Sequence, residues 1–245
     1  MKTDDANTWV HGENSERADR YIDTADLVVV ERRRTIKILA DLFSYQFEAP
    51  QDLSLLDLGC GDGVLSAHIN DRYPGNRFHL IDGSQEMIEK AREKLRGDHV
   101  SFTCQTFEDY IGVPAVKSSY DFVYSANAIH HLDLAGKRRL YSKVYQEMRR
   151  GGLFINIDPV LPTSERTEAL QFAMWTEWIN ENLARLGMGE KVGTYDGLPE
   201  GYKHRQENKP SGLAEQLQAL GEVGFNDVDC YFKYSVFAVF GGTKE

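Results

Sequence analysis

Three glycines, each two residues after the last, follow an apolar run at residues 53–58. They are Gly59, Gly61 and Gly63. Glycine has no Cβ atom, so it adopts positive φ angles at low cost and lets the backbone come close to a ligand. If the apolar run is a strand that leads into a helix, the first amides of that helix face a crevice at the sheet's carboxyl end. The spacing predicts a ligand site built from main-chain groups, although close packing of a helix on a strand also favours glycine.

A carboxylate follows at the distance expected for recognition of a sugar. Asp82 ends the apolar run at residues 78–81, about 20 residues after Gly63. In α/β folds that bind adenosine, an acid at this place accepts hydrogen bonds from the ribose hydroxyls. The alternative is a carboxylate that caps the following helix. The glycine loop one strand earlier favours ribose binding.

The charges of the glycine loop distinguish between two adenosine ligands. A dinucleotide places its pyrophosphate on the helix N-terminus, and the carboxylates of Asp57 and Asp62 would repel it. A ligand with an ammonium and a sulfonium group would be attracted by the same carboxylates. A nicotinamide dehydrogenase remains the rival at the level of the fold.

Two histidines and one aspartate are candidate catalytic residues. His130 and His131 follow the apolar strand at 121–125, and Asp158 ends the strand at 153–157. Either imidazole could act as a general base at the mouth of the site. The alternatives are a packed or capping histidine and an aspartate that caps a turn. No third ligand has the spacing of a zinc site, so we predict no metal.

The chain alternates strands and helices through most of its length, which predicts a doubly wound, mostly parallel α/β sheet. The expected strands are 53–58, 78–81, 100–104, 121–125, 153–157, 228–231 and 234–240, with the 151–152 glycine pair as a turn. The expected helices are 31–43, one from residue 64, 85–96, 136–149, 165–186 and 212–220. We expect one domain with an N-terminal helical lid (1–49), a cofactor-binding core (50–158), a helical cap insertion (159–211) and the end of the sheet (212–245).

Composition narrows the class of partner. The chain has 245 residues, is 41% hydrophobic and carries a net charge of −10, so a core is expected and a broad nucleic-acid surface is not. Three cysteines form no CxxC pair, and neither a signal peptide nor an apolar run of membrane-spanning length is visible. We therefore expect a cytoplasmic protein that acts on a small molecule, as a monomer or a homodimer.

Four segments together resemble class I S-adenosylmethionine-dependent methyltransferases. The run LLDLGCGDG at residues 55–63 resembles the first motif of that family, and HLIDGS at 79–84 the second. The run YDFVYSAN at 120–127 resembles the fourth motif, and MRRGGLFI at 148–155 the turn before strand five. The resemblance implies a seven-stranded Rossmann-like sheet with an antiparallel last strand, S-adenosylmethionine as cofactor and S-adenosylhomocysteine as product.

The resemblance also implies which residues bind the cofactor. Asp82 would hold the ribose, Met87 would lie against adenine, and the Phe107 amide would reach an adenine ring nitrogen. Thr106 stands where many members have an aspartate that contacts the adenine amino group. Tyr21 and one residue of the Arg32–Arg34 run, for which we choose Arg33, lie where relatives fold a helix over the cofactor. The other implied contacts are Asp57, Gly59, Cys60, Gly61, Gly83, Ser125 and Asn127.

Three functions fit these observations. The first is methyl transfer to an O, N or C nucleophile of a small molecule by in-line displacement, in which positioning supplies much of the catalysis. The second is an enzyme of modified S-adenosylmethionine in transfer-RNA wobble modification. The third is a module that binds the cofactor without turnover. Trp175 and Trp178 either roof the substrate or pack the cap, and the segment from Tyr202 to Arg205 either meets an anion or is solvated.

Overall fold

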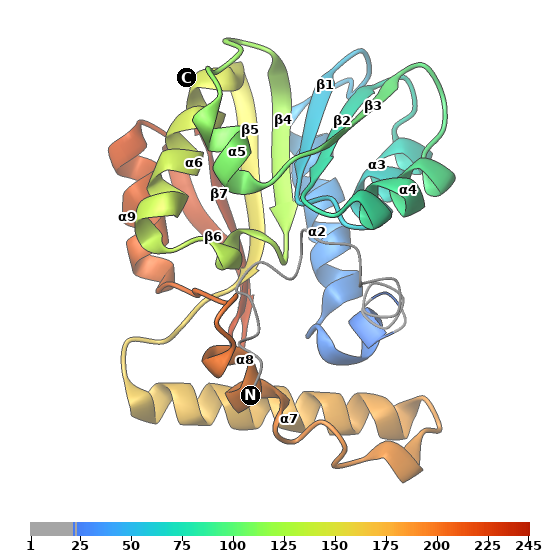
Figure 1. Cartoon of the computed structure of the whole chain (residues 1–245), viewed down its shortest axis with the longest axis vertical. Coiled ribbons are helices and arrows are strands. Elements are labelled where there is room, and N and C mark those ends of the chain that lie inside the picture. The colour runs from blue at the N-terminus through green and yellow to red at the C-terminus, as the bar shows by residue number, and fades with distance from the viewer. Residues whose placement is uncertain (1–21, 23) are drawn as a thin grey trace, which may run out of the picture.

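A seven-stranded sheet forms the centre of the computed structural model, which describes residue 22 and residues 24–245 (Figure 1). Its strand order is β3-β2-β1-β4-β5-β7-β6. The pairs from β3 to β5 are parallel, and β7 is antiparallel to both of its neighbours. The strands are β1 (Ser54–Leu58), β2 (Arg77–Asp82), β3 (Val100–Cys104), β4 (Tyr120–Ala126), β5 (Met148–Pro159), β6 (Asn226–Tyr234) and β7 (Phe237–Lys244). The predicted fold class is confirmed.

Helices cover both faces of the sheet (Figure 1). One layer is α2 (Arg32–Gln46), α3 (Val64–Arg72) and α4 (Gln85–Lys94); the other is α5 (Phe107–Gly112), α6 (Leu134–Glu147) and α9 (Leu213–Val223). Each layer packs its apolar side chains on its own face of the strands. Because both faces are covered, the central strands β1, β4 and β5 are buried along most of their length and read as nearly continuous apolar runs.

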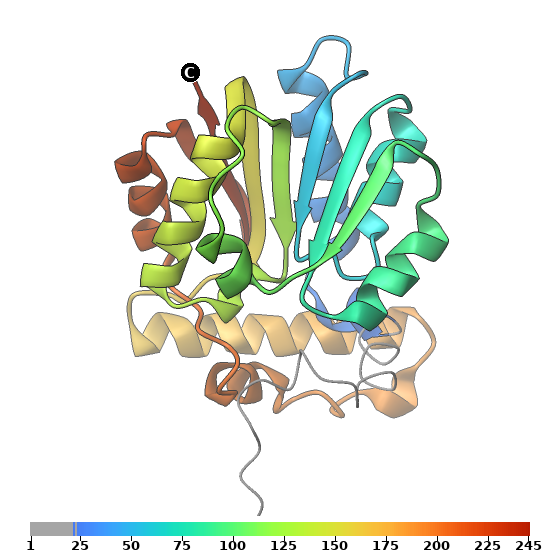
Figure 2. The ribbon, with the colours of Figure 1, turned by 45° about the horizontal axis from the view of Figure 1, so that its top comes forward.

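A helical segment after β5 crosses the carboxyl ends of the parallel strands. It contains α7 (Glu165–Arg185), the short helix η2 (Gly189–Lys191) and α8 (Leu198–His204). Figure 2 shows α7 running along this edge of the sheet. The segment packs on the residues before α2 and on the start of β7 through a third apolar cluster. No helix in the described part of the chain is long and apolar enough to span a membrane.

The boundaries differ from the sequence prediction at one place that matters for the sheet. Gly151 and Gly152 are not a turn between a helix and a strand, because α6 ends at Glu147 and β5 begins at Met148. The glycines lie inside β5, where the register with β4 shifts between Tyr120 and Phe122. A Cβ atom at Gly152 would lie 2.9 Å from the Asp121 carbonyl oxygen, so close approach of two strands explains that glycine. The short helices α5 and α8 were also not predicted.

Candidate functional site

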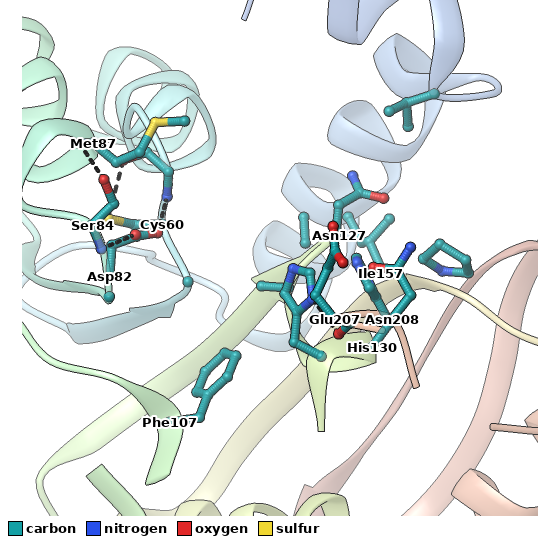
Figure 3. Close-up of a pocket in the computed structure, with 18 of the residues that line it drawn as sticks. Cys60, Asp82, Ser84, Met87, Phe107, Asn127, His130, Ile157, Glu207 and Asn208 are labelled. Atoms are coloured by element: carbon teal, nitrogen blue, oxygen red, sulfur yellow. Dashed lines mark hydrogen bonds between the residues drawn. The ribbon is translucent and has the colours of Figure 1, made fainter. Parts of the chain in front are cut away.

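A cavity of about 660 Å³ opens at the carboxyl ends of the strands, beneath the helical segment. It lies beside the neighbouring strands β1 and β4, where the strand order reverses and where α/β sheets bind ligands. In the close-up of Figure 3, Asp82, Ser84 and Met87 stand on one side, and His130, Ile157 and Asn208 stand on the other. The cavity therefore has a side formed by β1, β2 and their loops and a side formed by β4, β5 and the helical segment.

The glycine loop forms one wall of this cavity. Gly59, Gly61 and Gly63 have φ angles of 70°, 54° and 74°, a region that L side chains rarely adopt. A Cβ atom at Gly59 would lie 2.3 Å from the Cβ atom of Ala128, so this glycine lets the loop after β4 approach. A Cβ atom at Gly61 would meet no atom within 4 Å and would instead enter open space. The predicted conformational role of these glycines is what the structure shows.

Asp82 is fixed by the loop and keeps hydrogen-bonding capacity. Its Oδ2 accepts the Gly61 amide and its Oδ1 accepts the Ser84 amide, both at 2.8 Å. Burial raises the pKa of this carboxyl group, and the two amide hydrogen bonds oppose that shift. Each carboxylate oxygen accepts more than one hydrogen bond, so both can still receive one from a ligand. A pair of neighbouring hydroxyl groups, such as those of ribose, fits this arrangement.

The two other acids of the loop occupy different environments. Asp57 lies beneath the loop, 1% exposed, and is not among the residues that line the cavity. Ser66 donates to its Oδ2 at 2.6 Å, whereas Oδ1 has no hydrogen-bond partner in the described part of the chain. Burial, together with the charges of Asp82 and Asp62, raises the pKa of Asp57 to about 7. Asp62 lines the cavity and is paired with Lys94.

The residues expected around adenine, Met87, Thr106 and Phe107, all line the cavity. Met87 and Phe107 line the cavity on the side of Asp82. Thr106 also lines it, but its hydroxyl accepts the Asp109 amide at 3.1 Å and so caps α5. The Thr106 hydroxyl is therefore committed to the helix, because short polar side chains at this position satisfy the first free amides.

Ser125 and Asn127 were both expected at the cofactor, and only Asn127 lines the cavity. Ser125 is fully buried in β4, donates to the Leu58 carbonyl oxygen at 2.6 Å and does not line the cavity. This placement corrects the prediction, because successive residues of a strand point to opposite faces. Asn127, with a φ angle of 51°, does line it. Cys60 and Gly83 line it as well.

His130 and Asp158 form a buried pair at the far side of the cavity. His130 Nδ1 lies 2.7 Å from Asp158 Oδ1, and Asp158 is fully buried with Oδ2 unpartnered among the described residues. Donation of the Nδ1 proton to the carboxylate leaves Nε2 of His130 as a proton acceptor. His130 itself lines the cavity, whereas Asp158 stands behind it. The geometry is that of a base with a carboxylate that orients it.

His131 has a different environment from its neighbour. Its Nδ1 donates to the Glu207 carbonyl oxygen at 2.9 Å. Burial and the adjacent His130 lower its pKa to about 4. Of the two histidines predicted as alternatives, His130 has the carboxylate partner. His131 instead contacts the segment at residues 205–209, which lines the cavity.

The N-terminal predictions fall partly outside the described residues. Tyr21 is one of the residues that the structure does not describe. Arg33 is 87% exposed at its side chain, contacts Asp26 at 3.2 Å and does not line the cavity. Its neighbour Arg32 lines the cavity and donates to Asp26 at 2.6 Å. The choice of Arg33 is corrected, because consecutive helical residues point in directions about 100° apart.

Sequence reasoning missed much of the far side of the cavity. These residues come from the segment before α2, from α8 and the turn after it, and from the start of β7. They include Val28, Val29, Leu198, Gln206, Glu207, Asn208, Lys209 and Phe237. Trp175, for which two roles were open, both packs and lines the cavity, whereas Trp178 is not among the lining residues. Tyr202 and Arg205 also line it, and the only advance signal was their place in a charged, aromatic run.

Comparison with known proteins agrees with this geometry. A family model described as a methyltransferase domain matches residues 55–152. A phosphoethanolamine N-methyltransferase of Plasmodium falciparum is 28% identical over 61% of this chain, and the match covers 49% of that enzyme. A carboxy-S-adenosyl-L-methionine synthase of Hydrogenovibrio crunogenus is 26% identical over 80% of this chain and 75% of that enzyme.

A solved structure has the same fold. An O-methyltransferase family protein from Burkholderia thailandensis superposes with a TM-score of 0.65 at 13% identity. The superposition covers 95% of this chain and 61% of the Burkholderia chain.

Proposed function

Because the chain belongs to the class I S-adenosylmethionine-dependent methyltransferase family, we propose that it transfers a methyl group to a small-molecule nucleophile. The family's cofactor, S-adenosylmethionine, supplies an electrophilic methyl group on a sulfonium centre. The observation that carries the proposal is a single cavity lined by both Asp82 and His130. One side offers a carboxylate that can bind the ribose diol and so position the cofactor. The other side offers a proton acceptor that can deprotonate the nucleophile.

Cofactor binding is assigned to the side with the glycine loop. Asp82 receives the ribose hydroxyls, and Met87 and Phe107 contact the adenine ring. Of the two loop acids, Asp62 lines the cavity and pairs with Lys94, whereas Asp57 lies beneath the loop. A pyrophosphate would meet the Asp62 carboxylate at the helix N-terminus, which disfavours a nicotinamide dinucleotide in this place.

Proton removal is assigned to His130. Its Nε2 takes a proton from the nucleophile while Asp158 stabilises the imidazolium that forms. Residues 205–209 line the cavity beside His130, and the Lys209 amide donates to the His130 carbonyl oxygen at 2.7 Å. This segment excludes water from the proton transfer.

Isothermal titration calorimetry tests cofactor binding directly. We expect S-adenosylmethionine and S-adenosylhomocysteine to bind, and NAD to bind much more weakly. Asp82→Ala should lower the affinity for both adenosyl ligands by about 100-fold or more, because two hydrogen bonds to a charged group are lost. Asp71→Ala, which removes an exposed carboxylate of α3, is the matched control. Equal affinities for the wild type and Asp82→Ala would refute the assignment.

A second function is favoured by one observation. Two carboxy-S-adenosyl-L-methionine synthases match 75% and 83% of their own length, a larger share than the 49% of the N-methyltransferase. We therefore keep, as the alternative, the formation of a modified S-adenosylmethionine for transfer-RNA modification. Mass spectrometry of the purified protein's nucleoside distinguishes the two, because a carboxylated cofactor is heavier by one carbon dioxide unit.

A non-catalytic module would bind the cofactor equally well. Accumulation of S-adenosylhomocysteine that depends on an added acceptor separates turnover from simple binding. The net charge of −10 supports a free small molecule rather than a nucleic acid as the acceptor. The three free cysteines support a reducing compartment, and we propose the cytoplasm. We propose a monomer or a homodimer, and sedimentation distinguishes the two.

A further inference from the structure

The far side of the cavity is walled by apolar groups from segments distant in sequence. Val28 and Val29 precede α2, Trp175 lies on α7, Leu198 begins α8 and Phe237 begins β7. The rings of Trp175 and Phe237 pack edge to face, with centroids 5.0 Å apart. The Trp175 indole already donates to the Val28 carbonyl oxygen at 2.8 Å, so it presents carbon rather than a donor. Such a wall accommodates an apolar ring system.

One polar group within this apolar wall lacks a partner. The hydroxyl oxygen of Tyr202 is buried and makes no hydrogen bond to any described residue. The Tyr202 ring packs edge to face on Trp175 and His130, with centroids 5.7 and 5.5 Å apart, and lines the cavity. Burial and the nearby charge of Asp158 raise its pKa far above the usual range, so the hydroxyl stays protonated and can donate. Buried polar groups without partners are rare and costly, which indicates that a ligand satisfies this one.

Tyr202 and His130 together present complementary hydrogen-bonding groups. Tyr202 offers an O–H donor. Nε2 of His130 offers an acceptor, because Nδ1 donates to Asp158. A hydroxyl group accepts one hydrogen bond and donates another, so it matches both. A methyl acceptor with a carboxylate would be repelled by the buried charge of Asp158. A methyl acceptor with an ammonium group would lose its hydration next to an apolar wall, which is costly.

We propose that the acceptor is an apolar ring compound with a nucleophilic hydroxyl group, a phenol or enol, held between Tyr202 and His130. This inference rests on the proposed methyltransferase function. The hydroxyl oxygen forms a bond to the methyl carbon, the carbon–sulfur bond of S-adenosylmethionine breaks with its electron pair left on sulfur, and the hydroxyl proton goes to His130 Nε2. The products are a methyl ether, S-adenosylhomocysteine and an imidazolium that later releases its proton to water.

Binding to the S-adenosylhomocysteine-loaded protein tests the proposal without relying on turnover. Naphthol, naphthylamine and naphthalene serve as matched probes, with calorimetry as the readout. We expect naphthol to bind most tightly and Tyr202→Phe to weaken it by about 5- to 20-fold, because one buried hydrogen bond is lost. The same change should leave naphthalene binding unaltered. Tyr195→Phe removes a hydroxyl from the same helical segment at a residue that does not line the cavity, and it should change neither ligand.

The outcomes separate this inference from the proposed function. If S-adenosylhomocysteine binds but naphthol binds no better than naphthalene, the acceptor class is refuted and the methyltransferase function stands. Equal weakening of both probes by Tyr202→Phe, or methylation of naphthylamine in preference to naphthol, refutes it as well. If neither adenosyl ligand binds, the proposed function itself fails.

Discussion

The Asp57 carboxyl group should make the folded protein less stable as the pH rises. Its pKa is raised from 3.8 in a model compound to about 7 in the fold, chiefly by burial. The folded state therefore retains a proton that the unfolded chain has released. The contribution of this site to the free energy of unfolding falls by about 1.4 kcal/mol per pH unit between about pH 4 and pH 7. Above about pH 7 this contribution is constant. Across the window the cost reaches about 4 kcal/mol as an upper bound.

Asp57→Asn isolates this cost. The asparagine oxygen can still accept the Ser66 hydroxyl, but its amide nitrogen would replace an oxygen that has no partner, at a cost of about 1–3 kcal/mol. We therefore expect the variant to be more stable than the wild type by roughly 1–3 kcal/mol at pH 8, and the difference to shrink toward pH 5.

Urea unfolding of the ligand-free protein at several values between pH 5 and pH 8 measures this difference. Asp71→Asn, an exposed change on α3, is the control and should leave the pH dependence as it is. A difference between Asp57→Asn and the wild type that does not change with pH would show that Asp57 ionises normally in the fold and would refute the reasoning.

Three further predictions concern Asp158, the glycine loop and the segment at residues 205–211. Asp158→Asn should lower kcat by about 100- to 1000-fold and change the cofactor Kd by less than about twofold, in stopped-flow and calorimetric assays, because the His130 imidazolium loses the negative charge that stabilises it. Gly59→Ala should weaken cofactor binding by at least about tenfold and lower the Tm, because its Cβ atom would collide with Ala128 at a positive φ angle. Lys137→Met should speed hydrogen exchange at residues 205–211 while the rest of the chain stays protected, because Lys137 Nζ donates to this segment at 2.6 and 2.9 Å.

Local sequence pattern predicted the strands of the sheet and two of the residues that line the cavity, Gly59 and Asp82. The apolar runs that became β1, β4 and β5 are buried on both faces, so their hydrophobicity depends little on distant contacts. Gly59 and Asp82 belong to loops whose geometry follows from the strands before them. Their positions at the cavity were therefore predictable from spacing alone.

The far side of the cavity depends on contacts between segments that are distant in sequence, and the spacing of residues does not encode these contacts. Tyr202 meets His130 only because the segment after β5 folds back over the sheet. The choice between Arg32 and Arg33 depended on the rotation of α2, which a run of three arginines does not define. Ser125 has a polar side chain in a motif that resembles a cofactor contact, yet it satisfies a backbone carbonyl inside the sheet.

A crystal structure of the protein with S-adenosylhomocysteine tests the central claim most directly. We expect both ribose hydroxyl groups within hydrogen-bonding distance of the Asp82 carboxylate, and the sulfur atom facing His130 across the cavity. Adenosine bound elsewhere, or ribose hydroxyls that contact no oxygen of Asp82, would contradict the account.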